Sequence, residues 1–263
     1  MFWNDQSAND YAAVGLKMSD QGRKARVLGI VPARGGSKGI ARKNVRVLAG
    51  RPLLAYTASA ALKSVYLSRI LLSTEDAEIA NVGRQVGLEA PFVRPPELAL
   101  DSTPMMDVVL HAVRWVQGHG EEYDAVCLLQ PTSPLRRTSM IDRCISLFFA
   151  KGVDSVVSVR PVPLEYNPHW VYFEAPDGLL QPSTGQRDPI PTRQLLPPAY
   201  HRDGSVFVTR TNILLTQGSL YGTRTLGVVS PDEEAIDLDT EDQWESLERR
   251  LQSELTALPP PFR

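Results

Sequence analysis

The chain has 263 residues, of which 43% are hydrophobic and 22% are charged. This size and composition fit a compact α/β domain, with or without an appendage, and exclude a disordered, collagen-like or coiled-coil chain. The net charge of -2 argues against a general nucleic-acid binder. Two cysteines, Cys127 and Cys144, are too few for a disulfide framework, and neither a run of about 18 apolar residues nor a signal-peptide pattern is present. We therefore expect a reduced, cytoplasmic protein without a membrane partner.

Strands and helices alternate along most of the chain. Short apolar runs between turn residues predict buried strands, and apolar residues at helical spacing predict helices. In chain order we expect strand 27–33, helix 53–62, strand 70–73, helix 76–86, helix 103–116, strand 126–129, helix 139–150, strand 155–159, strands 204–209 and 226–229, and helix 241–255. Strands that alternate with helices need crossovers, so this order predicts an α/β fold with a doubly wound, mostly parallel sheet.

A proline-rich segment interrupts this alternation. Nine of the 21 prolines lie between Arg160 and Pro198, where they cannot continue a helix or a central strand. We expect a loose N-terminal extension over residues 1–24, one folded domain over 25–258 with an inserted arm at 160–200, and a tail at 259–263. The arm either lies at an interface or over the functional site, or it is a long surface loop.

The charges are distributed unevenly. Between Gln21 and Thr74 there are eleven Lys and Arg and no Asp or Glu, whereas ten carboxylates lie between Asp232 and Glu254. A basic loop and an acidic segment could hold a phosphate chain and its divalent cation between them. The alternative is ordinary solvated surface charge.

A glycine-rich basic turn follows the first predicted strand and reads RGGSKGIARKN from Arg34 to Asn44. Ligands of open parallel sheets gather at the carboxyl ends of the strands, and glycines let backbone N–H groups approach phosphate oxygens. The turn therefore predicts a phosphate site with positive charge from Arg34, Lys38 and Lys43. It matches neither a Walker loop nor G-x-G-x-x-G, which disfavours a kinase or a dinucleotide oxidoreductase. The alternative is a flexible turn with incidental cations.

Two aspartates, Asp237 and Asp239, are separated by one residue near the C-terminus. In an extended segment residues two apart share a face, so both carboxylates can bind one hard cation such as Mg²⁺ while Ile236 and Leu238 enter the core. The alternative is a helix cap by Asp239 or Thr240, with Gln243 completing a capping box.

These motifs, together with LQPTSPLR at Leu129 to Arg136, resemble the CMP-nonulosonate synthetases, or acylneuraminate cytidylyltransferases. The similarity covers about residues 27 to 251 and includes STED at Ser73 to Asp76, RPPELALDS at Arg94 to Ser102 and IDLDT at Ile236 to Thr240. The resemblance implies a nucleotidyltransferase domain of the nucleotide-diphospho-sugar transferase type, with an extended arm exchanged in a homodimer. It therefore favours the interface reading of the arm.

The resemblance also implies a reaction, in which CTP and a nonulosonic acid give the CMP-sugar and pyrophosphate with the help of Mg²⁺. Two other readings stay open. One is a nucleotidyltransferase with another base or acceptor, such as 3-deoxyoctulosonate or a sugar 1-phosphate, for which Arg136, Arg137 and Arg160 would supply a second basic cluster. The other is a non-catalytic nucleotide-binding module.

By motif position, the resemblance assigns roles to individual residues. Arg34 and Lys43 would act as catalytic residues on the phosphates, with Lys43 stabilising charge at the α-phosphate. The substrate-binding residues would be Gly35, Gly36, Ser37, Lys38 and Asn44 on the phosphates, Arg94 and Asp101 on cytosine and ribose, Gln130 on the sugar and Arg193 on its carboxylate. Asp237 and Asp239 would hold the metal.

The chain departs from the family pattern at several positions, and one of them concerns the acceptor. Many members carry Asn-Gly where this chain has Asp203-Gly204, in a stretch that borders the sugar in relatives. A carboxylate in place of the neutral amide leaves the identity of the sugar open. His201 nearby is either a proton acceptor or a polar surface residue.

Overall fold

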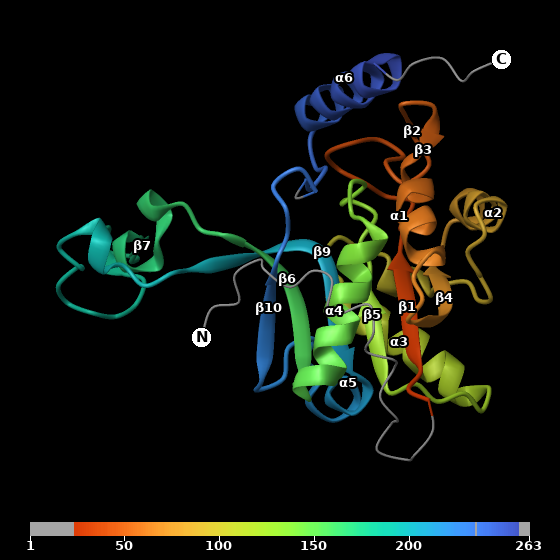
Figure 1. Ribbon diagram of the computed structural model, residues 1–263, viewed down its shortest axis with the longest axis horizontal. Helices are drawn as coiled ribbons and strands as arrows, with labels where there is room; N and C mark the ends of the chain where they lie inside the picture. The colour runs from red at the N-terminus through yellow and green to blue at the C-terminus, as the bar shows by residue number, and fades with distance from the viewer. Residues whose placement is uncertain (1–23, 235, 258–263) are drawn as a thin grey trace.

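The computed structural model describes residues 24–234 and 236–257 (Figure 1). Its main sheet has six strands in the order β10-β6-β9-β5-β1-β4. The strands are β1 (Val27–Pro32), β4 (Leu67–Ser73), β5 (Ala125–Leu128), β6 (Ser155–Pro161), β9 (Tyr200–Arg210) and β10 (Thr225–Val229). β1 is parallel to β4 and β5, and β10 is parallel to β6, while β9 runs antiparallel to its neighbours β5 and β6. The predicted mostly parallel sheet is confirmed.

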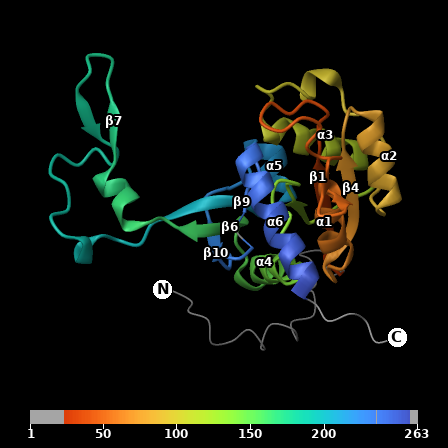
Figure 2. The same ribbon diagram turned by 90° about the horizontal axis from the view of Figure 1, so that it is seen from above.

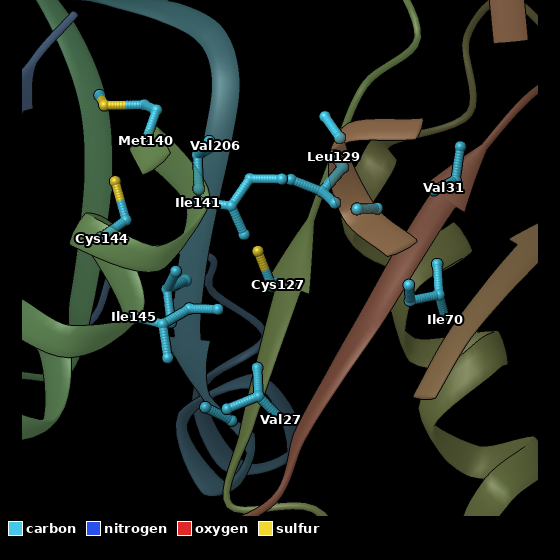
Figure 3. Packing of buried hydrophobic residues seen from close by; sticks show 14 of the residues in the cluster. Val27, Val31, Ile70, Cys127, Leu129, Met140, Ile141, Cys144, Ile145 and Val206 are labelled. Atoms are coloured by element: carbon cyan, nitrogen blue, oxygen red, sulfur yellow. The ribbon is translucent and has the colours of Figure 1, made fainter. Parts of the chain in front are cut away.

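Helices cover both faces of this sheet (Figure 2). One face carries α1 (Leu53–Leu62), α2 (Ala77–Gln85) and α4 (Thr138–Lys151), and the other carries α3 (Met105–Gly118) and α5 (Thr211–Gln217). Figure 3 shows Ile141 and Ile145 of α4 packed beside Cys127 of β5 on the first face. All six residues of β1 are buried, because helices press on both sides of this central strand. The doubly wound class is therefore confirmed.

Local signals explain where the helices begin and end. The side chain of Asp76 accepts a hydrogen bond from the N–H of Ile79 and caps α2, as Asp commonly does. Gly87, with φ of +91°, ends the same helix, and Gly152, with φ of +59°, ends α4. These left-handed conformations favour glycine, which is why the sequence marks both ends.

Some elements were not predicted. A two-stranded hairpin of β2 (Val47–Leu48) and β3 (Arg51–Pro52) follows the basic turn, and α5 follows β9 without a break. α5 has only seven residues and begins with Thr directly after a strand residue, so no turn signal separates the two elements. The 3-10 helix η2 (Pro96–Leu98) lies in the RPPELALDS stretch.

The segment between β6 and β9 projects from the sheet as an arm (Figures 1 and 2). It contains η3 (Leu164–Tyr166), η4 (Pro168–Trp170), β7 (Tyr172–Glu174), β8 (Leu180–Pro182) and η5 (Arg193–Leu195). The antiparallel pairing of β6 and β9 continues to Pro161 and Tyr200 and leads into the arm. Its elements stay at three residues each because prolines interrupt every longer run.

A third apolar cluster joins the basic turn to the end of the chain. Its buried members are Ile40, Leu48, Leu53, Leu238, Trp244 and Leu247. They come from the turn, the hairpin, α1, the segment around Asp237, and α6 (Glu241–Ala257). Burial of these side chains brings the two ends of the domain together at the carboxyl edge of the sheet.

Within residues 24–234 and 236–257, no helix has both the length and the apolar character needed to cross a membrane. The predicted extension at 1–24, apart from Lys24, and the tail at 259–263 lie outside the described residues.

Candidate active site

The basic turn has a fixed shape. Asn44 is buried, and its side-chain amide donates a hydrogen bond of 2.9 Å to the carbonyl oxygen of Arg34, which ties the two ends of the turn together. The backbone N–H groups of Val45 and Arg46 donate to the carbonyl of Arg42, which has φ of +53°. Asn44 therefore shapes the turn, whereas the sequence reading placed its side chain on the phosphates.

Lys43 connects this turn to the paired aspartates. Its Nζ atom donates to the carbonyl oxygen of Leu238 at 2.7 Å and lies 2.9 Å from Oδ1 of Asp239. Leu238 is held from the other side as well, because its N–H donates to the carbonyl of Thr132 at 2.9 Å. The prediction that the basic turn and the two aspartates lie side by side is confirmed.

Gly39 allows this close approach. A Cβ atom at Gly39 would overlap the carbonyl oxygen of Asp239. The turn and the segment 236–239 therefore touch through their backbones, and only glycine fits at the contact.

The side chains of segment 236–239 alternate as predicted. Ile236 and Leu238 join the third apolar cluster, whereas Asp237 and Asp239 are exposed. The pKa of Asp237 is raised, first by desolvation among the surrounding protein atoms and then by the negative charge of Asp239, against the effects of the Thr132 hydroxyl and Lys43. Two like charges lie close together here, an arrangement that a divalent cation relieves.

The helix cap uses other atoms. The side-chain oxygen of Gln243 accepts from the N–H of Asp239 and of Thr240, and the N–H of Gln243 points to the Thr240 hydroxyl at 3.4 Å. Thr240 and Gln243 thus form the capping box, and neither the Asp237 nor the Asp239 carboxylate takes part in it.

Arg34 and Lys38 meet the predicted ribose residue. Arg34 Nη2 lies 2.6 Å and Lys38 Nζ lies 2.7 Å from the two carboxylate oxygens of Asp101. These two cations lower the pKa of Asp101. The side chain of Lys38 is 81% exposed, which leaves it free to change partners. Ser37 and the exposed Gly36 lie between them in the turn.

Glu75 and Asp76 of the STED motif also contact the turn. Glu75 Oε1 accepts from the N–H of Gly35 at 2.6 Å, and its Oε2 lies 2.7 Å from Nη2 of the buried Arg94. Asp76 pairs with Arg42 at 2.6 Å, and this partner lowers the pKa of Asp76 to about 2. The sequence reading gave these two residues no role, although their position directly after the strand that becomes β4 was the available signal.

The charge asymmetry has a structural counterpart. The basic segment has no acid of its own, and its cations pair with carboxylates from later segments. The pairs in the turn are Arg34 and Lys38 with Asp101, Arg42 with Asp76 and Glu78, Lys43 with Asp239, and Arg46 with Glu241. Ion pairs between exposed side chains, such as Lys38 with Asp101, are weak because water screens them, so a polyanion can replace the carboxylate.

Gln130 and Asp237 both lie beside Gly204. A Cβ atom at Gly204 would lie 3.7 Å from Oδ2 of Asp237 and 3.8 Å from Oε1 of Gln130. Gly204 has φ of +79°, so the bend of β9 that brings these groups together favours glycine.

Asp203 is buried, and its carboxylate accepts hydrogen bonds from the hydroxyls of Ser158 and Ser230 and, at 2.9 Å, from the N–H of Ser205. These three buried donors hold the carboxylate inside the protein, and its negative charge contributes to the raised pKa of Asp237. His201 is exposed, with Nδ1 3.1 Å from the carbonyl oxygen of Arg202.

Arg193 is separate from the other predicted residues. It lies exposed in η5 of the arm, which projects away from the sheet (Figure 1). The turn, Arg94, Asp101 and the two aspartates are linked by the contacts above, but Arg193 of the same chain does not join them.

The residues present fit a magnesium ion in part. Among the described residues no group of three or more His, Cys, Asp and Glu could hold a metal. Asp237 and Asp239 provide two hard oxygen ligands, and Mg²⁺ commonly binds through one or two carboxylates plus substrate phosphates and water. These two carboxylates would need a phosphate substrate and water to complete the coordination of such an ion.

A doubly wound sheet with a basic turn after its first strand and acidic residues beside it is the arrangement expected of a nucleotidyltransferase. The family model described as "Cytidylyltransferase" matches residues 28–166. The chain belongs to this cytidylyltransferase family and is an enzyme of nucleotidyl transfer.

Individual relatives agree with this assignment. The chain is 33% identical to the CMP-N,N'-diacetyllegionaminic acid synthase of Legionella pneumophila, over 89% of this chain and 99% of that protein. It is 29% identical to a pseudaminic acid cytidylyltransferase of Campylobacter jejuni, over 80% and 90%. The fold is similar to the solved structure of a CMP:2-keto-3-deoxy-manno-octonic acid synthetase complexed with CTP, with a TM-score of 0.64, 14% identity, and coverage of 88% of this chain and 100% of that one.

Proposed function

We propose that the protein couples CTP to a nonulosonic acid and releases pyrophosphate. The observation that carries this proposal is the contact of Lys43 with Leu238 and Asp239, which places a cation of the phosphate turn beside two carboxylates. The relatives named for legionaminic and pseudaminic acids support the acceptor class. Among these acids we propose N,N'-diacetyllegionaminic acid as the first candidate for the acceptor, because the relative named for it is 33% identical to this chain over 99% of its own length.

The proposed site divides the substrates among its residues. The triphosphate would exchange with the carboxylates that now pair with Arg34 and Lys38, and the exposure of these side chains permits the exchange. Once the triphosphate has replaced it on Arg34 and Lys38, the Asp101 carboxylate can accept hydrogen bonds from the ribose hydroxyls. Arg94 would lie on the side of the base. Gln130 and Gly204 border the acceptor next to Asp237.

In the proposed reaction the anomeric hydroxyl of the acid attacks the α-phosphorus, the bond to the β-phosphate oxygen breaks, and the hydroxyl proton leaves to solvent. Lys43 is placed to stabilise the negative charge that grows at the α-phosphate. A magnesium ion held by Asp237 and Asp239 would offset charge on the triphosphate when bound.

The arm supports a homodimer. Its exposed apolar side chains are Leu164, Tyr166, Tyr172, Phe173, Leu179, Leu180 and Leu195. Such a concentration of exposed apolar surface marks an interface. A second copy of the chain would cover it, and the arm would carry Arg193 to the acceptor carboxylate in the partner's site. Sedimentation equilibrium of the full chain tests this, since a monomer at micromolar concentration contradicts it.

The reading with a sugar 1-phosphate acceptor loses one of its three arginines. Arg136 is buried and donates to Ser205, Thr57 and the carbonyl of Gln130, so it is not available to a second phosphate. Arg137 pairs with Glu234 at 3.3 Å, but its side chain is exposed.

The cytoplasm stays our prediction for the compartment, on the ground that Cys127 and Cys144 are free thiols.

One assay tests the proposed function. The protein is incubated with Mg²⁺, each of the four NTPs, and sialic, legionaminic, pseudaminic or 3-deoxyoctulosonic acid, and pyrophosphate is measured. Release with CTP and a nonulosonic acid is the expected result. Release with another NTP and a sugar phosphate, or with no pair, contradicts the proposal.

A further inference from the structure

Glu75 connects two parts of the nucleotide site that the chain supplies separately. Gly35 belongs to the phosphate turn after β1, and Arg94 follows the bend after α2. The two oxygens of one carboxylate bind both, at 2.6 Å and 2.7 Å. Each of these two contacts is a hydrogen-bond donor facing an anion, the strong form of the bond.

The orientation of Arg94 depends on this contact. The residue is only 2% exposed, and within the described residues Glu75 is the carboxylate that pairs with it. Its buried Nε atom has no hydrogen-bond partner among the described residues. Burial and, after it, the positive charge of Arg94 lower the pKa of His111 on α3. A buried guanidinium with one anionic partner is held in place by that partner.

The STED motif positions Glu75 from both sides. Asp76, the next residue, caps α2 and pairs with Arg42 of the turn. The N–H of Arg94 donates to the carbonyl of Thr74, the preceding residue, at 2.9 Å. The backbone on both sides of Glu75 is therefore tied to the same two elements that its carboxylate joins.

We propose that Glu75 is a positioning residue for the nucleotide, which fixes the distance between the phosphate turn and Arg94 and so selects a cytidine triphosphate. This inference rests on the proposed function, because Arg94 is there the group on the base side. Glu75 has its carboxylate filled by Gly35 and Arg94, so it acts through them rather than on the substrate.

The test compares Glu75→Gln with Glu75→Asp and the control Glu89→Gln. The glutamine has the same shape but turns an NH₂ group toward one of two donors, whereas the aspartate keeps the charge and is too short to reach both. Glu89 pairs with Arg69, outside the site, at 2.6 Å. Steady-state kinetics with CTP, UTP and the acid, calorimetric binding of CTP alone, and the melting temperature are measured for each variant.

For Glu75→Gln we expect the KM and Kd for CTP to rise about 10-fold or more, with kcat and the KM for the acid changed less than about 3-fold. The preference in kcat/KM for CTP over UTP falls by about 5-fold or more. Glu75→Asp should change the KM and Kd for CTP and the preference for CTP in the same direction but by smaller factors. Glu89→Gln should behave as the unmodified chain.

Other outcomes overturn the inference. A purely structural Glu75 lowers the melting temperature and the active fraction, with the KM for CTP unchanged. A carboxylate that merely competes with phosphate for Gly35 gives a lower KM for CTP in Glu75→Gln. If Glu75→Gln does not fold, Glu75→Asp, which keeps Arg94 paired, decides the question. An unmodified chain that transfers no cytidylyl group rejects the proposed function instead, and calorimetry with CTP still tests Glu75.

Discussion

The Nζ atom of Lys43 lies 2.9 Å from a carboxylate oxygen of Asp239, 196 positions further along the chain. The side chain of Lys43 is 12% exposed, and its Nζ atom contacts both a backbone carbonyl oxygen and the Asp239 carboxylate. Substitution of Lys43 by Met should therefore reduce kcat by about 10²–10³-fold, the usual effect of removing one group that stabilises transition-state charge. Lys63→Met, at the exposed end of α1, serves as the control. An unchanged kcat in Lys43→Met would remove this lysine from the mechanism.

Variants of Asp239 and Thr240 test the proposed role of the Asp239 carboxylate in turnover separately from the cap of α6. Asp239→Asn should lower turnover strongly with little change in melting temperature, because the cap is formed by Thr240 and Gln243. Thr240→Ala should do the opposite and cost about 1 kcal/mol of stability with turnover retained. Both variants are measured by pyrophosphate release and urea unfolding. If Asp239→Asn unfolds easily and keeps its turnover, the carboxylate is structural.

A substitution at Gly39 tests the backbone contact between the basic turn and the segment 236–239. A methyl group in Gly39→Ala overlaps the Asp239 carbonyl, so the two segments must separate, at a cost of about 1–3 kcal/mol. We expect a loss of about 5-fold or more in kcat/KM, since about 1 kcal/mol of lost transition-state stabilisation corresponds to that factor. Gly118→Ala, where no atom lies within 4 Å, is the control. Equal kinetics for the two variants would show that the contact does not matter.

The low pKa of Asp76 predicts that the free energy of unfolding decreases in acid. Its folded pKa of about 2 lies below its ordinary value of 3.8, so the ionised carboxylate stabilises the fold above about pH 4. This contribution is lost as the pH falls from about 4 to about 2. Asp76→Asn should therefore be less stable than the unmodified chain at pH 7, with a smaller difference at pH 2.5. Urea unfolding at both pH values measures this, with the exposed Asp188→Asn as the control. A constant difference argues against the Arg42 pair.

The burial of Asp203 predicts that substitutions there lower the stability of the fold and leave the preferred acceptor unchanged. Because its carboxylate accepts from Ser158, Ser205 and Ser230, Asp203→Ala leaves buried donors unsatisfied, at about 1–3 kcal/mol for each. Asp203→Asn keeps an acceptor and should leave the order of preference among the acids unchanged. Urea unfolding and the acid panel check both variants. A new preferred acid in Asp203→Asn would place this side chain against the sugar after all.

Sequence patterns were most informative where a local signal has one physical meaning. Val27 to Pro32 is apolar throughout because a central strand is covered on both faces, and the sequence predicted this strand with one residue more at its end. Gly87 marked the end of α2 for the same kind of reason. By contrast α5, which starts directly after β9, has no separate turn signal, and its seven residues are too few for periodicity to show.

The candidate site divides in the same way. The amino-acid sequence by itself determined the sheet class, the basic turn and the alternation of Asp237 and Asp239 with buried Ile236 and Leu238, since these depend on neighbours along the chain. Only the tertiary structure decided that Asp203 faces inward, that Arg193 stands apart in the arm, and that Glu75 joins Gly35 to Arg94. Side-chain direction at such positions depends on donors and charges supplied by distant segments, which no local pattern encodes.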